Sequence, residues 1–366
     1  MNKKLISSLA GVCIFLLIFS YCERKTLPTD SSSGKVGNAN PDLVQVNIGE
    51  TTLTLEKIGE NYVLEGDILF SPEQIQNLQN NSTLSKPLGA GLTGYRWPNN
   101  TVYYKINASY GQPGEVSDAI SHWESWTFLD FVERTTETNY IEFINGTGCS
   151  SYLGMIGGRQ YITLEQACSL GNTIHEIGHA VGLLHEHTRS DRDNYVTIHW
   201  SEIESGKEHN FQKYSTRGIS GFDYSSFNFN SIMLYGPYDF SDTGNPTITK
   251  VDGSTYSNNT SYLSSGDRNI INYMYPPPPP VISLTTYYNH PQITWSLITG
   301  VSSYKIYRRD NNGAYVQIGS TAGNNYIDTA REVGSQVQPY YYTMYYVKAC
   351  ASACSDYSSP VFTYTH

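Results

Sequence analysis

The chain has 366 residues, of which 23 are basic and 33 acidic, giving a formal net charge of −10 at neutral pH. This balance argues against a nucleic-acid partner, because binding to phosphates requires a basic face and the sequence shows no basic stripe. The length predicts two or three folded units, and the hydrophobic fraction of 39% is sufficient to give them cores.

The amino end has the pattern of a secretory signal. Lys3 and Lys4 precede an apolar run of about fifteen residues, which is too short to remain as a membrane-spanning helix. Residues 1–22 are therefore predicted to direct export, so that the protein is secreted or faces the extracellular space.

Cys22, where this signal ends, leaves two interpretations open. A cysteine at this place is typical of lipoproteins, in which the thiol is acylated after cleavage and tethers the protein to a membrane. Phe19 and Tyr21 are poor matches for the small residues usual before such a cysteine, so Cys22 is alternatively removed with the signal. The polar, turn-rich residues 26–41 then predict a flexible tether.

The middle of the chain mixes strand and helix patterns. Residues 96–106 alternate like a strand. A helix is predicted to begin near Ser264 and to end before Pro276. Another helix is predicted from four apolar residues that share one face, namely Val116, Ala119, Ile120 and Trp123.

Four of the nine histidines lie within residues 175–187, in the stretch HEIGHAVGLLHEH. Helical spacing from Thr173 to about Leu184 puts His175 and His179 one turn apart on the same face, where two imidazoles can share one cation. Gly182 tolerates the backbone of a sharp turn, which would return His185 to the same point.

Three neutral imidazoles predict a catalytic zinc site, because they leave a fourth coordination position for water. Glu176, beside the first histidine, could take a proton from that water. The alternative, that these are surface or core histidines, is disfavoured because the full pattern HExxHxxGxxH constrains five positions. A metal site is therefore predicted at His175, His179 and His185.

A run of five prolines at 276–280 marks a boundary, since such a run stays extended and holds two domains apart. Residues 281–366 show short strand patterns separated by turns, which predicts an all-β sandwich. This pattern resembles a fibronectin type III module, with Trp295 in an early core strand. In an oxidising compartment, two local cysteine pairs predict disulfides, Cys149 with Cys168 and Cys350 with Cys354.

The stretch HEIGHAVGLLHEHTRSDRDNYV, followed by SIMLYG, resembles the astacin family of zinc endopeptidases within the metzincin clan. The pattern of that family runs HExxHxxGxxHExxRxDRDxYV and then SxMxY, and the similarity extends from about residue 90 to 275. The resemblance implies an α+β fold, in which a two-lobed metzincin domain carries its active-site helix under a twisted sheet and is followed by the all-β sandwich.

The resemblance implies a role for each matching residue. Zinc would be the cofactor, with His175, His179 and His185 as ligands and Glu176 as the general base. Tyr235 would be a movable ligand that swings to hydrogen-bond the oxyanion.

Two further residues receive roles in the same way. Met233 would form the apolar floor beneath the imidazoles, and Glu186 would receive the amino terminus of the mature enzyme. The alternative for Met233 and Tyr235 is ordinary buried packing.

The resemblance also implies how a peptide substrate is held. Residues 151–155 would pair with the peptide as an added β-strand, and Gly157 and Gly158 would then turn the chain away. Cys149 and Cys168 match one disulfide of the family. The second is missing, because Phe128 stands near one of its positions and no cysteine lies near Tyr275.

Residues 62–70 resemble the inhibitory FxGD motif of the family, with Leu64 where phenylalanine is usual. Asp67 would occupy the open zinc position and displace the water, because a carboxylate is a regular zinc ligand. An unidentified protease would then activate the zymogen by cleaving between about Lys86 and Gly91. The alternative is that EGD is an ordinary turn.

These observations divide the chain into a signal at 1–22, a tether and propeptide at 23–88, a peptidase domain at 89–275, a linker at 276–280 and a sandwich at 281–366. The predicted function is a secreted or surface-tethered, monomeric zinc endopeptidase that hydrolyses proteins or peptides and is made as a zymogen. The alternative is a catalytically silent metzincin-fold adhesin that acts through its carboxy-terminal module.

Overall fold

The computed structural model describes residues 42–48, 51–80, 95–219, 221–311, 313–334 and 342–365. The predicted signal, Cys22, the tether at 26–41 and the predicted cleavage region at 86–91 lie outside these residues. Among the described residues, no helix has the length and apolar character needed to cross a membrane.

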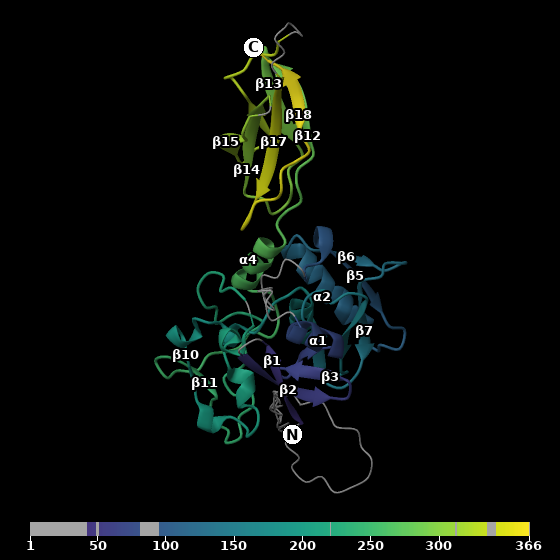
Figure 1. Ribbon diagram of the computed structural model, residues 1–366, viewed down its shortest axis with the longest axis vertical. Coiled ribbons are helices and arrows are strands. Elements are labelled where there is room, and N and C mark those ends of the chain that lie inside the picture. Colours follow the sequence, from purple (N-terminus) through teal and green to yellow (C-terminus); the bar gives the residue numbers. More distant parts are fainter. Residues whose placement is uncertain are drawn as a thin grey trace, which may run out of the picture.

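The described chain forms two bodies of different architecture (Figure 1). Residues 42–275 build the larger body, which contains both helices and strands and confirms the α+β prediction. Residues 282–365 build the smaller, all-β body at one end of the molecule, and residues 276–281 connect the two without regular structure.

One sheet runs through the larger body. Within the described residues it has nine strands, in the order β1-β2-β3-β4-β8-β9-β7-β5-β6. Strands β5, β6, β7 and β9 pair in parallel, whereas β8 is antiparallel to β9. These strands are β5 (Thr101–Ile106), β6 (Asp130–Glu133), β7 (Tyr140–Asn145), β8 (Cys149–Tyr152) and β9 (Arg159–Leu164).

The region predicted as a propeptide forms the other four strands of this sheet. Successive strands of this region pair antiparallel, and the last of them joins β8 in parallel, with Ile68 opposite Ser151. The elements are β1 (Leu43–Ile48), β2 (Thr51–Ile58), β3 (Asn61–Leu64), β4 (Ile68–Phe70) and α1 (Pro72–Asn80). We refer to residues 42–80 as the prosegment.

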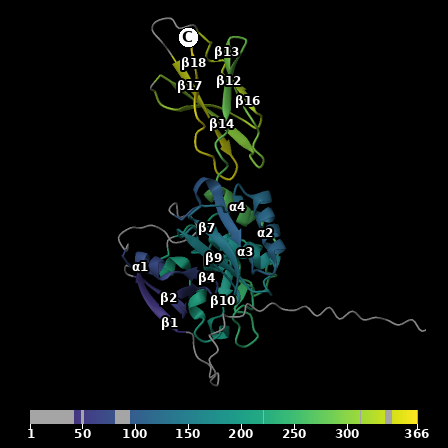
Figure 2. The same ribbon diagram turned by 90° about the vertical axis from the view of Figure 1, so that its right-hand side faces the viewer.

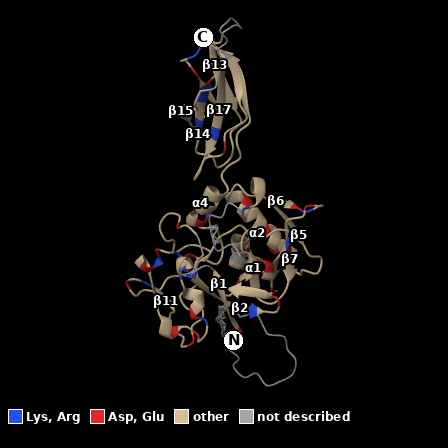
Figure 3. Ribbon diagram, in the orientation of Figure 1, with Lys and Arg blue, Asp and Glu red and all other residues tan. Residues whose placement is uncertain are grey.

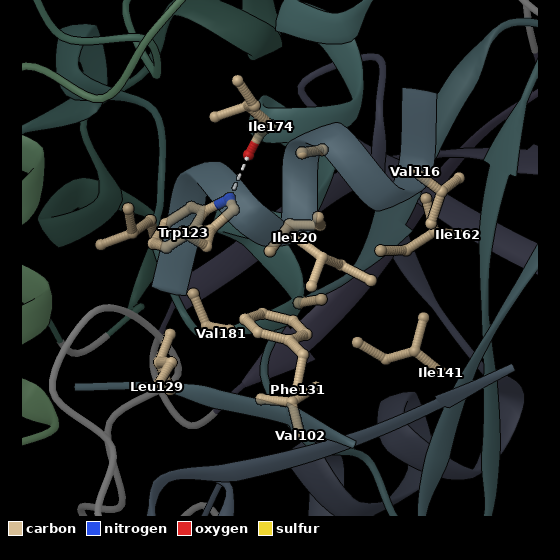
Figure 4. Close-up of a cluster of buried hydrophobic side chains, with 14 of the residues drawn as sticks. Val102, Val116, Ile120, Trp123, Leu129, Phe131, Ile141, Ile162, Ile174 and Val181 are labelled. Carbon is tan, nitrogen blue, oxygen red and sulfur yellow. Dashed lines mark hydrogen bonds between the residues drawn. The ribbon is translucent and has the colours of Figure 1, made fainter. Parts of the chain in front are cut away.

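The core of the larger body lies between the sheet and two packed helices, α2 (Pro113–Trp126) and α3 (Leu170–Ala180). The predicted apolar face of α2 is buried throughout, which confirms the helical periodicity. Trp123 is fully buried, and its indole nitrogen donates a hydrogen bond of 3.2 Å to the carbonyl of Ile174 on α3 (Figure 4). Helix α3 is thereby held against α2.

Helix α3 differs from its predicted limits. It begins at Leu170 under a capping box of Ser169 and Asn172 and ends at Ala180, not near Leu184. The helix stops early because Gly182 has a φ of 103°, a backbone conformation that a helix cannot continue through. Gly182 therefore makes the predicted sharp turn. The helix itself ends about one turn before its predicted limit.

The part of the larger body that follows α3 contains, within the described residues, little regular structure beyond short 3₁₀ turns. It is closed by the strand pair β10 (Val196–Ile198) and β11 (Ile248–Lys250) and by α4 (Ser265–Met274). Helix α4 begins and ends as predicted, with Ser264 as its cap. The 3₁₀ turns found in the described residues are η1 (Pro98–Asn100), η2 (Glu186–Thr188), η3 (Arg192–Asn194), η4 (Trp200–Glu202), η5 (Glu208–Phe211) and η6 (Tyr214–Arg217).

The smaller body consists of two sheets, with strand orders β12-β13-β16 and β15-β14-β17-β18. Trp295 and Tyr304 are buried between them, with ring centroids 5.2 Å apart. The strands are β12 (Ile282–Tyr287), β13 (His290–Trp295), β14 (Ser303–Asp310), β15 (Val316–Thr321), β16 (Asn325–Ile327), β17 (Tyr342–Cys350) and β18 (Val361–Tyr364).

Both predicted disulfides are present, Cys149 with Cys168 and Cys350 with Cys354. The second closes a short turn directly after β17. In both views α4 lies at the end of the larger body that faces the smaller body (Figures 1 and 2), and Ser352 donates a hydrogen bond of 3.3 Å to Asn269 on this helix. Acidic and basic residues are interspersed over the described part of the larger body (Figure 3).

Candidate active site

The three predicted histidine ligands converge at the end of α3. His175 and His179 project from one face of the helix, and the turn at Gly182 brings His185 beside them. A fourth group, the carboxylate of Asp67, comes from the turn between β3 and β4 of the prosegment. One ligand atom from each of these four buried residues lies within 4.8 Å of the others.

The outer nitrogen of each imidazole is fixed by an acceptor. Nδ1 of His175 lies 2.7 Å from the carbonyl of Ile232, and Nδ1 of His179 lies 2.7 Å from the carbonyl of Leu183. A carbonyl oxygen only accepts, so each Nδ1 carries the hydrogen and each Nε2 turns a lone pair inward. Such outer partners orient metal-binding histidines and set their tautomer.

The spacing of the inner atoms fits a zinc ion. Nε2 of His175 and Nε2 of His185 are 3.2 Å apart, and Oδ2 of Asp67 lies 3.4 and 3.3 Å from these two nitrogens. Oδ1 of Asp67 lies 3.5 Å from Nε2 of His179. Tetrahedral ligands with bonds of about 2.0–2.1 Å are about 3.3 Å apart, and converging lone pairs repel one another unless a cation lies between them.

Glu176, the predicted base, is buried beside the first histidine on α3. Met233 lies directly against the same helix, because a Cβ atom at Gly178 would come within 2.7 Å of its sulfur. The carbonyl of Met233 accepts a hydrogen bond of 3.0 Å from the amide of Glu186. The turn around Met233 thus supports both the helix and the segment that carries His185.

Asp267, in the first turn of α4, supports this turn. Its carboxylate accepts hydrogen bonds from the Ser231 hydroxyl at 2.6 Å and from the Ile232 amide at 3.1 Å. Burial raises the pKa of Asp267, although these hydrogen bonds act in the opposite direction. The amino end of α4 therefore holds Ile232, whose carbonyl in turn orients His175.

Tyr235 lies at the edge of the histidine cluster. Its ring contacts His187, with centroids 3.9 Å apart, and His185, with centroids 4.7 Å apart. Its hydroxyl donates a hydrogen bond to the backbone carbonyl of Glu65 in the prosegment. In this structure Tyr235 is therefore engaged by the prosegment.

Glu186 is largely enclosed behind His185. One carboxylate oxygen accepts a hydrogen bond of 2.8 Å from the amide of Asn228 and lies 3.4 Å from the Arg189 guanidinium. Burial raises the pKa of Glu186 to about 8, although Arg189 lowers it.

The prosegment enters the cleft as a tight turn. Glu65 and Gly66 have φ values of 55° and 81°, and Gly66 lies against the Phe240 ring, where a Cβ atom would be 3.0 Å from Cζ. The carbonyl of Asp67 accepts a hydrogen bond of 2.9 Å from the amide of Ser151. The edge of β8 is thereby covered by the prosegment.

Strand β8, which includes the start of the stretch predicted to pair with a substrate peptide, ends earlier than predicted. Strand β8 ends at Tyr152, so residues 153–155 of the predicted substrate strand lie outside it. The chain turns away at Gly154, which has a φ of 67°, and not first at Gly157. A Cβ atom at Gly154 would come within 2.8 Å of the Tyr95 carbonyl, so this close approach of two backbone segments requires glycine.

Two residues at the site were not predicted from the sequence, Glu65 and Arg217. The Glu65 carboxylate lies 2.6 Å from Nδ1 of His185 and accepts a hydrogen bond from the Arg217 guanidinium. Burial alone would raise the pKa of Glu65, but Arg217 and then His185 outweigh it and hold the pKa at about 2. No motif indicates this pair, since the two residues are 152 positions apart.

A hollow of about 510 Å³ is lined in part by His175. It is lined by the first turn of α3, by residues 236–239 and by residues 255–260. The histidine cluster therefore borders both the prosegment and a space large enough for side chains of a peptide.

Comparison with known proteins gives a consistent result. A family model described as Astacin, a family of peptidases, matches residues 92–276. The chain is 33% identical to Protein SpAN of Strongylocentrotus purpuratus over 228 residues, which are 58% of this chain and 37% of SpAN. It is 33% identical to zinc metalloproteinase nas-4 of Caenorhabditis elegans over 246 residues, which are 63% of this chain and 77% of nas-4.

A solved structure also matches, that of High choriolytic enzyme 1, a hatching enzyme zinc-protease from Oryzias latipes. Sequence identity is 31%, the match covers 50% of this chain and 93% of that one, and the TM-score is 0.46. The chain spans about a third of the length of SpAN.

Proposed function

This chain belongs to the astacin family of peptidases, and from this we propose that it is a zinc-dependent endopeptidase held latent by its own prosegment. The observation that carries the proposal is the convergence of three imidazoles and one prosegment carboxylate on a single point. A donor set of this kind binds zinc, and the part of it that belongs to the peptidase domain is a three-histidine set.

In the proposed mechanism, His175, His179 and His185 hold the metal. Zinc bound there would lower the pKa of a water molecule toward neutrality and would polarise the carbonyl of the peptide bond. Glu176 takes a proton from the water and later delivers one to the leaving amine.

The Tyr235 hydroxyl donates a hydrogen bond to the oxyanion that forms from the peptide carbonyl. It already donates to a backbone carbonyl, that of Glu65, which supports this assignment. One well-placed donor of this kind typically contributes about 3 kcal/mol to stabilisation of the transition state. Met233 supports the site through its packing against α3.

The proposed latency has two components. Asp67 takes the coordination position that the water needs, and β4 covers the edge of β8 on which a substrate strand would pair. Cleavage between about Lys86 and Gly91 by an unidentified protease would release the prosegment. Glu186 would then receive the new amino terminus, and its position beside Arg189 and the Asn228 amide, with its side chain 16% exposed, supports this role.

The proposal extends to the remaining parts of the chain. Residues 1–22 direct export, and a lipid on Cys22 remains the alternative to free secretion. The strand orders of the two carboxy-terminal sheets support a fibronectin type III-like module. The protein acts as a monomer on protein or peptide substrates.

The test is hydrolysis of casein by the processed protein, with and without a chelator. We expect the chelator to abolish cleavage and added zinc to restore it. Glu176→Gln should lower kcat by at least about a hundredfold, because it removes the general base, while the protein still binds about one zinc per chain. Full activity in this variant would refute the role of Glu176, and a processed protein without zinc or activity would refute the proposed function.

A further inference from the structure

We propose that the outer face of the carboxy-terminal sandwich binds an acidic polysaccharide, through a cluster of tyrosine rings bordered by basic side chains. This site belongs to the smaller body, outside the histidine cluster, and does not depend on the proposed hydrolysis. We refer to the rings as the tyrosine cluster. Its members, on β14, β17 and the segments beside these strands, are Tyr307, Tyr315, Tyr346 and Tyr357.

The tyrosine cluster lies on the side of its sheet that faces away from the sandwich core. Ile306 and Val347 are fully buried in that core. Their neighbours along the two strands, Tyr307 and Tyr346, project from the opposite side and are directly paired across β14 and β17. The outer side of an antiparallel sheet is usually polar, so the gathering of aromatic rings here has a cause other than formation of the core.

The rings of the cluster contact one another and are partly open to solvent. Tyr315 stacks on Tyr357, with centroids 4.8 Å apart and an angle of 16° between the rings. Tyr307 meets Tyr357 edge-on at 5.0 Å, and Tyr346 meets Tyr315 edge-on at 4.9 Å. Tyr315 is 44% exposed and Tyr357 is 36% exposed, whereas Tyr346 is buried. The cluster therefore presents two supported rings to a ligand.

The backbone holds Tyr357 in place. This residue lies in the segment that returns beside β17 after the second disulfide. On one side of it the Ser355 amide donates a hydrogen bond of 2.7 Å to the Ala349 carbonyl, and on the other the Ser358 amide donates one of 3.0 Å to the Val347 carbonyl. A ring fixed in this way loses little conformational freedom when a ligand binds, which favours affinity.

Three basic side chains border the tyrosine cluster, namely Lys305, Arg309 and Lys348, and they lie on β14 and β17 (Figure 3). Nζ of Lys348 lies 4.0 Å from the centroid of Tyr357, and the Arg309 guanidinium lies 5.4 Å from that of Tyr315. Lys305 is directly opposite Lys348 across the two strands. Like charges so placed destabilise a sheet, and an anion bound between them would relieve this repulsion.

The charges of this face differ from those of the rest of the chain. Within the described residues, the three bordering cations form no ion pair with a carboxylate, whereas Arg308 and Arg331 pair with Asp328 and Asp310 at 2.9 and 2.6 Å. Residues 281–366 contain five basic and four acidic residues, but residues 1–280 contain 18 and 29. The face therefore complements a polyanion that the remainder of the chain would repel.

An acidic polysaccharide fits both the rings and the cations. A sugar ring places its C–H bonds against the electron-rich face of an aromatic side chain, and its hydroxyl groups can hydrogen-bond the phenol. Its carboxylate pairs with a neighbouring ammonium or guanidinium group. A nucleic acid is disfavoured, because the net charge of −10 opposes a phosphate backbone. An acidic polypeptide would supply the charge but no sugar ring for the tyrosines.

The experiment measures binding of the full-length, uncleaved precursor to alginate, a polymer of uronic acids, at low salt. Two further polymers separate the contributions of ring and charge. Propylene glycol alginate keeps the sugar rings but has esterified carboxyl groups, and poly-L-glutamate has the carboxylates without the rings. We expect alginate to bind at least about tenfold more tightly than either, because it alone engages both the tyrosines and the cations.

Variants of the full-length precursor test the named side chains. Tyr315→Ala should weaken alginate binding by at least about fivefold. Lys348→Gln, which keeps every ring, should weaken it by at least about threefold at low salt, and this difference should shrink as the salt concentration rises. Tyr288→Ala, at an 83% exposed tyrosine in the turn between β12 and β13, and Lys105→Gln, on the peptidase domain, are the controls and should leave binding as it is.

Absence of alginate binding, or equal binding of either matched polymer, would overturn the proposal, and this comparison needs no variant. Tighter binding of double-stranded DNA than of alginate would assign the face to nucleic acid and would overturn it as well. An equal loss of affinity in Tyr315→Ala and Tyr288→Ala would refute the role of the tyrosine cluster. None of these results bears on the proposed endopeptidase, which the hydrolysis of casein decides separately.

Discussion

The carboxylate of Asp67 and the three imidazoles are held by different mechanisms. His175 and His179 are fixed from outside by hydrogen bonds from Nδ1 to backbone carbonyls of the peptidase domain, whereas Nδ1 of His185 lies 2.6 Å from Glu65 of the prosegment. Asp67 reaches the imidazoles because the chain turns tightly at Gly66. His175 and His179 can therefore keep their positions when the prosegment leaves, whereas His185 loses its partner at Nδ1. Latency at the metal then depends on one side chain that is not itself part of the peptidase domain.

Replacement of Asp67 by Ala should therefore activate the uncleaved precursor. We expect casein hydrolysis by Asp67→Ala to rise at least about tenfold above that of the unaltered precursor, because the fourth coordination position becomes available to water. Glu60→Ala, an exposed change in the same prosegment, serves as the control and should stay latent. A silent Asp67→Ala precursor with zinc bound would remove Asp67 from the latency scheme.

A second prosegment carboxylate, Glu56 on β2, makes a buried ion pair with the peptidase domain. Both of its oxygens lie 2.8 Å from Nζ of Lys207, and Nε2 of His209 lies 3.5 Å away. Burial by itself raises the pKa of Glu56, but His209 and Lys207 outweigh it and leave the pKa below the usual 4.5.

Glu56→Gln should destabilise the precursor by about 3 kcal/mol near pH 7, because it leaves Lys207 buried without its partner. Because the pKa of Glu56 is lower in the folded state, its charge stabilises the folded protein at pH values above the unfolded pKa. This contribution is lost as the pH falls through the folded pKa. Urea unfolding at a series of pH values should thus show the difference between variant and parent shrinking below about pH 4.5. A difference that stays constant down to pH 3 would show that the charge of Glu56 contributes nothing.

Among the elements, α4 contacts the end of α2 near Phe128, where the family resemblance implies one position of a disulfide that this chain lacks. The Asn272 side chain accepts a hydrogen bond from the Phe128 amide and donates one to the Trp126 carbonyl, both at 3.2 Å. The Arg268 guanidinium lies over the Trp126 ring, 4.3 Å from its centroid. Helix α4 is therefore tied to the end of α2 by one amide and one cation–π contact.

Asn272→Ala should lower the free energy of unfolding by about 1–3 kcal/mol, because it leaves two backbone groups without partners. Ser265→Ala, an exposed change on the same helix, should alter it by no more than about 0.5 kcal/mol. Chemical unfolding of both variants measures the difference. An equal effect of the two changes would show that the Asn272 amide does not stabilise the contact between α4 and the end of α2.

At the scale of the whole molecule, the prosegment and the sandwich relate differently to the peptidase domain. The prosegment continues the main sheet through the pairing of β4 with β8. The sandwich has its own core around Trp295 and Tyr304, separate from the core around Trp123. The prosegment is therefore part of the same folded body as the peptidase domain, whereas the sandwich is a separate folded unit attached to it.

A chain truncated after Pro280 should therefore fold and, once processed, cleave short peptides with a kcat/KM within about threefold of the full chain. This end point keeps the hydrogen bond of 2.7 Å from the Asn100 amide to the Pro276 carbonyl. Peptide hydrolysis by both proteins at equal zinc content is the measurement. A large loss in the truncated chain would show that the sandwich contributes to the cleft.

The sequence by itself determined the features that depend on spacing within one element. The four-residue interval puts His175 and His179 on one helical face, Gly182 permits the turn to His185, and the apolar face of α2 is buried as its periodicity predicts. These features follow from helix geometry and from the conformational freedom of glycine, so they need no knowledge of distant contacts.

Only the tertiary structure decided which distant groups meet. The pairing of Glu65 with Arg217, the support of Ile232 by Asp267 and the place of β4 on the edge of β8 join segments tens to more than a hundred residues apart. Their side chains carry no periodic signal, because each partner is chosen by packing and by the need to neutralise a buried charge. The metal site could thus be predicted from the sequence, whereas the buried pair of Glu65 and Arg217 beside it became visible only in the folded precursor.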